Sequence, residues 1–338
     1  MNNPTLTGNK PVMHAILAAL TAGSMAASPH VAAQAYPTKA VRIIVPHPVG
    51  GPGDIPPRGF AQGLSQTMGQ PFVVENRDGG DGVIGVDACA KASPDGYTIC
   101  STSNGTTIVN SVVRPKLSYD PFKDLVGIVQ TGTLYSMIMA RPEVPANNIT
   151  EVLALLKAKP ESLTLGTYGA INMAAMVGQF TKSRMGAAFY PVPYKSASQA
   201  LNAALAGDVQ VVGFALGAAS IHVKAGKMKP LAVNSDKRLP AFPNVPTLKE
   251  AGIDVNYRSW FAFFAPAATP RDVVRRINAE TAKMIADPQF KAKFLTSQGL
   301  ETDFPTGASP EEFAKFLLEE REDFIRLVKV ANIPIQKD

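Results

Sequence analysis

The chain has 338 residues, of which 46% are apolar and 18% are charged. This composition is sufficient for one large or two medium globular cores, and it excludes a chain that is disordered throughout. The formal net charge of +6 comes from scattered lysines and arginines without basic runs interleaved with aromatic residues, so nucleic acid is not an expected partner.

The first 35 residues have the features of an export signal. Lys10 precedes a short apolar stretch of small residues at 12–27, and the "AQA" at 33–35 fits the small-x-small cleavage rule. A retained membrane anchor is the alternative, but the stretch is shorter than a clean bilayer span. We expect residues 1–35 to be removed, Tyr36 to begin the mature chain, and the mature protein to be periplasmic.

Strand and helix patterns alternate over the first third of the mature chain. β-branched runs closed by proline, glycine or asparagine predict strands, and amphipathic runs between them predict helices. This order predicts parallel βαβ units with right-handed crossovers. The strands are expected at 40–46, 71–76 and 97–103, and the helices at 58–68 and 83–92.

The same alternation resumes further along the chain, which predicts a second α/β lobe. No low-complexity linker separates the two regions, so we expect strands that cross between the lobes. The expected helices of the second lobe lie at 150–159, 172–184 and 196–206, and the strands at 163–167, 190–194 and 209–215.

Two amphipathic helices are expected near the C-terminus. Thr269 is the predicted N-cap of the first, with Pro270 at its first helical position. Ser309 and Glu312 form a predicted capping box for the second. We assign no chemistry to these helices.

The two cysteines leave two alternatives open. Cys89 lies in a predicted helix and Cys100 in the strand that follows it. A disulfide would suit an oxidising compartment. Two buried free thiols are the favoured expectation.

Residues with catalytic or metal-binding spacing are not found. Once the export signal is removed, only His47 and His222 remain as histidines, and neither lies in a metal-ligand motif. The serine-hydrolase elbow and the phosphate-binding P-loop are absent as well. We therefore expect no catalytic residue, no metal and no cofactor, with a hydrolase of unrecognised triad as the alternative.

The segment "VPHPVGGPGD" at 45–54 lies between the first strand and the first helix, where open α/β folds place their ligands. Gly50, Gly51 and Gly53 can take positive φ and expose their amides, and Asp54 is a natural N-cap. Backbone N–H groups beside a helix N-terminus form an anion cradle. Nearby prolines remove some donors, which favours a carboxylate over a polyphosphate. A tight turn without a ligand is the alternative.

The stretch "YPTKAVRIIVPHPVGGPGD" at 36–54 resembles the amino terminus of the Bug family, the extracytoplasmic substrate-binding proteins of tripartite tricarboxylate transporters. Further matches follow in order, among them "GQPFVVENRDGGDGVIG", "VPYKSASQALNAALAGDV" and "KRLPAFPNVPTLKEAG". The resemblance covers residues 36–330.

The resemblance implies an α/β periplasmic-binding-protein fold, in which two lobes close around a small organic acid. We expect lobe I at 36–132 plus 261–338, and lobe II at 133–260. The implied function is that of a receptor, not an enzyme, which delivers its ligand to the membrane permease subunits of a tripartite transporter. Presentation of the liganded protein to a periplasmic sensor ectodomain is the alternative.

The resemblance also implies the binding site. Backbone amides and hydroxyls of the loop at 47–54 and of a second loop at 166–175 are expected to hold the ligand, with a third edge at 101–106. The expected ligand-binding residues are His47, Val49, Gly50, Gly51, Gly53, Asp54, Ser103, Asn104, Thr167, Tyr168, Gly169, Ala170, Ile171, Asn172 and Phe214.

Departures from the family's pattern concern the ligand. The family usually has Ser, His and Asp where this chain has Met173, Ala175 and Phe214. An unpaired buried donor costs ~1–3 kcal/mol, so the loss of polar side chains predicts an acid with an apolar or aromatic body. A short aliphatic dicarboxylate is the alternative, in which case these side chains pack beneath the loops. His47 replaces a phenylalanine and is expected to contact the carboxylate.

Overall fold

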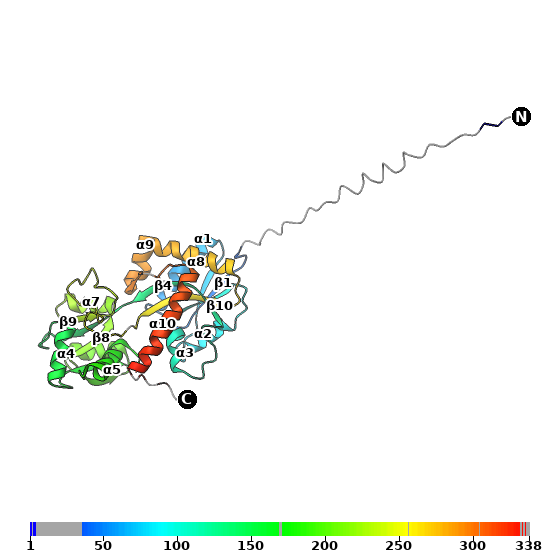
Figure 1. Cartoon of the computed structure of the whole chain (residues 1–338). Coiled ribbons are helices and arrows are strands. Elements are labelled where there is room, and N and C mark those ends of the chain that lie inside the picture. The colour runs from blue at the N-terminus through cyan, green and yellow to red at the C-terminus, as the bar shows by residue number, and fades with distance from the viewer. Residues whose placement is uncertain are drawn as a thin grey trace.

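Two sheets, each covered by helices, organise the chain (Figure 1). The computed structural model describes residues 1, 3, 4, 36–168, 171–255, 257–303, 305–331, 333 and 335. The expected export signal therefore lies almost entirely outside the described residues, and Gly169 and Ala170 also lie outside them.

The first sheet combines parallel and antiparallel pairs in the order β11-β4-β10-β3-β1-β2. β1 pairs in parallel with β2 and β3, whereas β10 runs antiparallel to β3 and β4. The βαβ units predicted from the sequence are thus present. The strands are β1 (Val41–Val45), β2 (Phe72–Asn76), β3 (Thr98–Ser103), β4 (Leu125–Leu134), β10 (Ser259–Pro266) and β11 (Leu300–Glu301).

The second sheet has the order β7-β6-β8-β5-β9. β6 pairs in parallel with β7 and β8, and β5 runs antiparallel to β8 and β9. Its strands are β5 (Ser136–Ala140), β6 (Thr164–Tyr168), β7 (Tyr190–Tyr194), β8 (Val211–Ala215) and β9 (Lys229–Val233).

Each expected helix is present, but the first begins at Ile55, three residues before its expected start, and the helix at Leu216–Lys224 was not predicted. The helix after Thr269 also needs a correction at its start. Pro270 has ψ 136°, outside the helical region, so it is the N-cap residue and the helix begins at Arg271; Thr269 is not the cap. The capping box of Ser309 and Glu312 is present. The longer helices are α1 (Ile55–Met68), α2 (Val83–Ala90), α4 (Ile149–Ala158), α5 (Met173–Met185), α6 (Ala197–Ala206), α7 (Leu216–Lys224), α8 (Arg271–Ala286) and α10 (Pro310–Val330). Shorter helical segments are η1 (Gly105–Val109), α3 (Asn110–Val113), α9 (Pro288–Phe290), η2 (Lys291–Leu295) and η3 (Thr296–Gln298).

The chain crosses from the first sheet to the second by successive strands, as expected, whereas the described residues of the return crossing form no strand. Only Tyr135 separates β4 of the first sheet from β5 of the second, and the segment at 234–258 leads back into β10. The strands of the first sheet end at Leu134 before the first crossing and begin again at Ser259 after the second. Each position lies about two residues inside the range expected for lobe II. The boundaries themselves stay a prediction.

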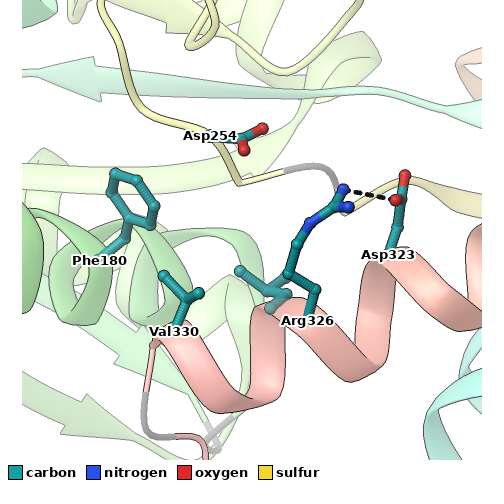
Figure 2. Close-up of a pocket in the computed structure, with 6 residues that line it drawn as sticks. Phe180, Asp254, Asp323, Arg326 and Val330 are labelled. Atoms are coloured by element: carbon teal, nitrogen blue, oxygen red, sulfur yellow. Dashed lines mark hydrogen bonds and ion pairs between the residues drawn. The ribbon is translucent and has the colours of Figure 1, made fainter.

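The C-terminal helix α10 contacts both lobes. Figure 2 shows Val330 of α10 near Phe180 of α5, beside a hollow of about 40 Å³. Ser183 of α5 donates a hydrogen bond to the carbonyl of Val330 at 3.3 Å. The end of α10 is thus packed on lobe II, although its beginning lies on the first sheet (Figure 1).

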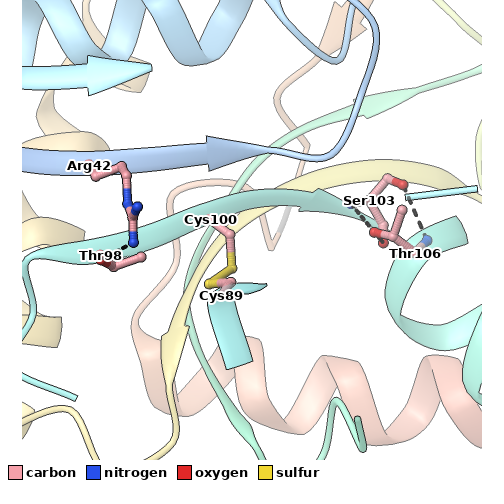
Figure 3. Close-up of a disulfide and its surroundings, with 6 residues drawn as sticks. All are labelled: Arg42, Cys89, Thr98, Cys100, Ser103 and Thr106. Carbon is pink, nitrogen blue, oxygen red and sulfur yellow. Dashed lines mark hydrogen bonds between the residues drawn. A yellow bond between two sulfur atoms is a disulfide. The ribbon is translucent and has the colours of Figure 1, made fainter. Parts of the chain in front are cut away.

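A disulfide joins α2 to β3, so the expectation of two free thiols was wrong (Figure 3). Helix α2 packs on β3 and brings the Cα atoms of Cys89 and Cys100 to 6.1 Å, within the usual range for a disulfide. Both cysteines are fully buried. The bond fixes the helix whose N-terminus follows the loop at 78–82.

Candidate functional site

A cleft of about 750 Å³ lies between the lobes at the carboxyl ends of β1 and β3. Lobe I supplies most of its lining, Ile171 comes from the segment after β6 of lobe II, and Tyr257 comes from the second crossing. The volume is that of an ordinary small-molecule site. The lining residues are Pro46, His47, Pro48, Asp78, Gly79, Gly80, Asp81, Gly82, Ser103, Gly105, Thr106, Val109, Asn110, Val113, Ile171 and Tyr257.

The loop at 78–82, between β2 and α2, forms one wall of the cleft. Four successive residues have positive φ, namely Gly79 (122°), Gly80 (58°), Asp81 (55°) and Gly82 (83°). A Cβ atom on Gly82 would lie 2.3 Å from the Thr106 side chain, so only glycine fits there. Asp81 tolerates the left-handed region better than most residues. This loop presents backbone to the cleft at the N-terminus of α2.

A second wall is the start of the helical segment formed by η1 and α3. The N–H of Ser103 donates to Thr106 Oγ1 at 3.0 Å, and the Thr106 N–H donates to Ser103 Oγ at 3.4 Å (Figure 3). Thr106 and Thr107 hydroxyls both donate to the Ser103 carbonyl. A helix N-terminus carries partial positive charge and unsatisfied amides, which suits an anion.

Asp54 holds the glycine loop at 47–54 in place through hydrogen bonds of its buried carboxylate. Its side chain is buried, and its carboxylate accepts hydrogen bonds from the Gly50 N–H at 2.9 Å, Arg58 Nε at 2.9 Å and Asn76 Nδ2 at 2.7 Å. Burial alone would raise the pKa of Asp54, but these hydrogen bonds and the Arg58 charge bring it below its usual value. The Gly50 amide is therefore already engaged within the protein.

The expected N-cap role of Asp54 needs a correction. Asp54 stands at the N-cap position of α1, but its side chain makes no capping hydrogen bond. Its backbone has φ −118° and ψ −42°, in the helical region, whereas a capping residue is usually extended. Asp54 acts instead as a tether between the loop, α1 and β2.

We expect Asp54→Ala to lower the free energy of unfolding by about 2–3 kcal/mol, because charged hydrogen bonds of a buried group are lost. The lowered pKa means that this contribution is complete above the unfolded pKa of about 3.9 and is lost as the pH falls through the folded value. Urea unfolding at pH 7 and pH 3 measures both quantities. An equal difference between wild type and variant at the two pH values would contradict the tether.

His47 lies at the floor of the cleft with an unpaired ring nitrogen. Its ring meets Phe261 edge to face at 5.6 Å and packs on Gly53, where a Cβ atom would lie 2.8 Å from the ring. Among the described residues, none makes a hydrogen bond with the buried His47 Nε2. Burial lowers the pKa of His47, against the opposing charges of Asp78 and Asp54. Burial therefore favours the neutral imidazole, whose Nε2 is shielded from solvent.

On the lobe II side, Asn172 caps α5 and Phe214 packs inward. The Asn172 side chain accepts a hydrogen bond from the Ala175 N–H at 3.0 Å and is 4% exposed. Phe214 packs against a buried cluster that includes Tyr135 and Leu201. Thr167 lines a separate hollow of about 260 Å³ on lobe II.

Tyr168 and Asn104 lie near Tyr257 of the cleft wall. Burial raises the pKa of Tyr168 to about 12, and the nearby Tyr257 adds to the shift. Burial also raises the pKa of Tyr257, against the lowering effect of its hydrogen bonds to Ser259 and Asn104. Asn104 thus makes a hydrogen bond with Tyr257, which lines the cleft.

Three of the expected site residues line the cleft together: His47, Ser103 and Ile171. Gly169 and Ala170 lie outside the described residues. Contact of the others with a ligand stays a prediction. Those described but not lining the cleft are Val49, Gly50, Gly51, Gly53, Asp54, Asn104, Thr167, Tyr168, Asn172 and Phe214.

The loop at 78–82, Asn110 and Tyr257 line the cleft but were not predicted from the sequence. The run "DGGDG" follows β2 just as "VGGPGD" follows β1, and this parallel placement is the signal that could have identified the loop. Tyr257 had no comparable signal, since it follows lobe II in the chain and reaches the cleft only through the crossing.

Among the residues that the structure describes, no group of three His, Cys, Asp or Glu side chains could hold a metal ion. Within the same residues, no helix is long and apolar enough to cross a membrane.

Comparisons with known proteins agree with this geometry. Residues 57–333 match the family model described as "Tripartite tricarboxylate transporter family receptor". A UPF0065 protein of Bordetella pertussis is 33% identical over 84% of this chain and 87% of its own length.

Two solved structures are similar as well. The R. palustris Rpa4515 structure with adipate has 28% identity and a TM-score of 0.73, over 88% of this chain and 99% of the other. MatC of Rhodopseudomonas palustris with bound malate has 26% identity and a TM-score of 0.68, over 88% of this chain and 100% of the other. The chain therefore belongs to the tripartite tricarboxylate transporter receptor family, whose members are periplasmic solute-binding receptors and not enzymes.

Proposed function

We propose that this receptor captures a small organic carboxylate in the cleft between its lobes and delivers it to the membrane permease subunits of a tripartite transporter. The observation that carries the proposal is the meeting of three features at one cleft: His47 and Pro48 of the first loop, the glycine-rich loop at 78–82, and a helix N-terminus. Solved relatives hold adipate and malate, both small carboxylates, which supports the same ligand class here. Removal of residues 1–35 on export belongs to the same proposal.

The carboxylate should bind at the η1 end of the cleft. Ser103 Oγ, the His47 imidazole and first-turn amides of η1 supply donors within one region of the lining. An anion there also gains from the partial positive charge at the helix N-terminus. Binding would then bring the segment at 169–172 of lobe II toward lobe I, since Ile171 already lines the same cleft.

The rest of the ligand should be apolar or aromatic. The lining also holds apolar side chains and prolines, among them Val109, Val113, Ile171 and Pro46. Tyr257 adds a ring. An apolar body gains about 25 cal/mol for each Å² of surface removed from water. A short aliphatic dicarboxylate, like the ligands of the two relatives, is the competing ligand class.

Thermal unfolding of the chain from Tyr36 onward, against aromatic acids, aliphatic monoacids, diacids, tricarboxylates and neutral amides, tests the proposal. A ligand at 100 times its dissociation constant adds about 2.7 kcal/mol to stability. We expect stabilisation by monoacids with apolar or aromatic bodies and none by the neutral amides. Stabilisation by amides alone, or by no member of the panel, would contradict a carboxylate receptor.

A further inference from the structure

The charges on the cleft lining are unevenly distributed. Two carboxylates, Asp78 and Asp81, belong to the lining, whereas no lysine or arginine does among the residues that the structure describes. His47 is the one histidine among the described lining residues, and burial lowers its pKa, which favours the neutral ring. The donors that face a ligand are therefore backbone amides, hydroxyls, an imidazole and an amide side chain.

Both acids belong to the loop at 78–82, and two contacts hold Asp81 in place. The Asp81 carbonyl accepts a hydrogen bond from Asn110 Nδ2 at 3.1 Å, and the Asp81 carboxylate pairs with Arg114. The Asp81 side chain is nevertheless 77% exposed. Asp78 is exposed as well, and its charge acts on the His47 ring. Among the described residues, Asp78 thus has no ion-pair partner, whereas Asp81 shares its charge with Arg114.

The size of the cleft brings any second charge of a ligand under the influence of these acids. A cavity of 750 Å³ is about 11 Å across when taken as a sphere, so a charge at its centre lies within one Debye length, about 8 Å at physiological ionic strength, of the lining. The first carboxylate of a ligand is balanced by the amides and hydroxyls at Ser103 and η1. A second carboxylate would find two fixed acids and, among the described lining residues, no lysine or arginine, whereas an ammonium group would be attracted.

We propose that Asp78 and Asp81 are specificity-determining residues, which disfavour acids with a second carboxylate and favour acids whose far end is apolar or positively charged. This inference rests on the proposed function, since it concerns the far end of an acid bound in the same cleft. It assigns this receptor a ligand class different from the adipate and malate of its two solved relatives.

The experiment uses ligands that differ only in the charge at the far end. Hexanoate, adipate and 6-aminohexanoate form an aliphatic series, and benzoate, terephthalate and 4-(aminomethyl)benzoate form an aromatic one. Dissociation constants are measured by calorimetry at pH 7, with EDTA present so that no divalent cation bridges a ligand to the acids. We expect 6-aminohexanoate and 4-(aminomethyl)benzoate, the amino acids of the two series, each to bind wild type at least about tenfold more tightly than the diacid of the same series.

Neutralising variants isolate the two carboxylates. Asp78 lies in a loop and is exposed, and Asp81→Asn keeps a residue that tolerates positive φ, so both Asp78→Asn and Asp81→Asn should fold. Each should reduce the preference for the amino acid over the diacid by about threefold, and the double variant by about tenfold. The matched control is Glu322→Gln, an exposed acid of α10 outside the cleft lining, which should leave the preference within about twofold.

The outcomes separate the inference from the proposed function. The inference and the proposed function are both supported by two results together. Hexanoate or benzoate binds wild type, and the ratio of the dissociation constants of the diacid and the amino acid changes in the double variant but not in Glu322→Gln. Binding of either monoacid with an unchanged ratio in the double variant overturns the role of Asp78 and Asp81 and leaves the receptor function standing. Failure of every member of both series to bind wild type overturns the proposed function, and the inference with it.

Discussion

Arg258→Met should lower the free energy of unfolding by about 3–5 kcal/mol, because it leaves a buried carboxylate without its partner. Arg258 lies on the second crossing, and its guanidinium reaches Asp236 Oδ2 at 3.0 Å and Glu320 Oε1 at 2.7 Å. The side chain of Glu320 is only 7% exposed, and its second oxygen accepts a hydrogen bond from Trp260 Nε1 at 3.2 Å. The arginine thus joins α10 to the crossing between the lobes.

The stability that Arg258→Met loses should be larger at neutral pH than at acidic pH. Burial raises the pKa of Glu320 even with Arg258 present, and removal of Arg258 should raise it further. Glu320 takes a proton in both proteins as the pH falls through these raised pKa values. The difference between wild type and variant should therefore be largest at neutral pH and smaller at pH 4. Urea unfolding at pH 7 and pH 4 measures the change.

Two controls accompany Arg258→Met. The double variant Arg258→Met, Glu320→Gln removes the unpaired charge and keeps an acceptor for Trp260, so it should recover at least half of the loss. Arg275→Met breaks an exposed ion pair with Glu311 and should leave the free energy of unfolding close to that of wild type. Equal losses for Arg258→Met and Arg275→Met would show that the buried pair does not stabilise the crossing.

Removal of the Cys89–Cys100 disulfide should lower the free energy of unfolding by about 3 kcal/mol. The bond closes a segment with a sequence separation of 11, for which the loop-closure model gives about 3 kcal/mol. The double variant Cys89→Ala, Cys100→Ala should lose slightly more, because both side chains are fully buried and truncation leaves a small cavity.

Urea unfolding with and without a thiol reductant checks the disulfide. The reductant should lower the stability of wild type and leave the double alanine variant unchanged. An unchanged wild-type midpoint in a reductant that demonstrably yields two free thiols would contradict the stabilising role of the bond.

Local sequence signals predicted most of the fold. Helix ends were marked by chemistry that acts within one turn, such as Gly69 with φ 73° after α1 and the serine and glutamate of the capping box of α10. The alternation of strands and helices likewise predicted three strands of each sheet, whereas β4, β5, β9, β10 and β11 were not predicted. The start of α8 was placed one residue early because Pro270 suits a first helical position and an N-cap equally well, and only its backbone angles decide between them.

The sequence predicted the candidate site less well than the fold, because contacts between residues far apart in the chain determine which side chains line it. The glycine loop at 47–54 was placed correctly at the end of β1, but Asp54 turns inward to Arg58 and Asn76, which lies on β2. The disulfide required the packing of α2 on β3, which spacing alone does not reveal. Phe214 alternates with neighbours on β8, and only the placement of that strand in the second sheet shows that it joins a buried cluster.

The crystal structure of the chain from Tyr36 onward, grown with the acid that stabilises it most, tests the central claim most directly. We predict the carboxylate within hydrogen-bond distance of Ser103 Oγ and the first amides of η1, and the body of the acid against Ile171 and Tyr257. The acid bound instead in the separate groove of about 660 Å³ beside Tyr135 and Asp303, or in the hollow of lobe II near Thr167, would contradict the assignment of the cleft as the ligand site.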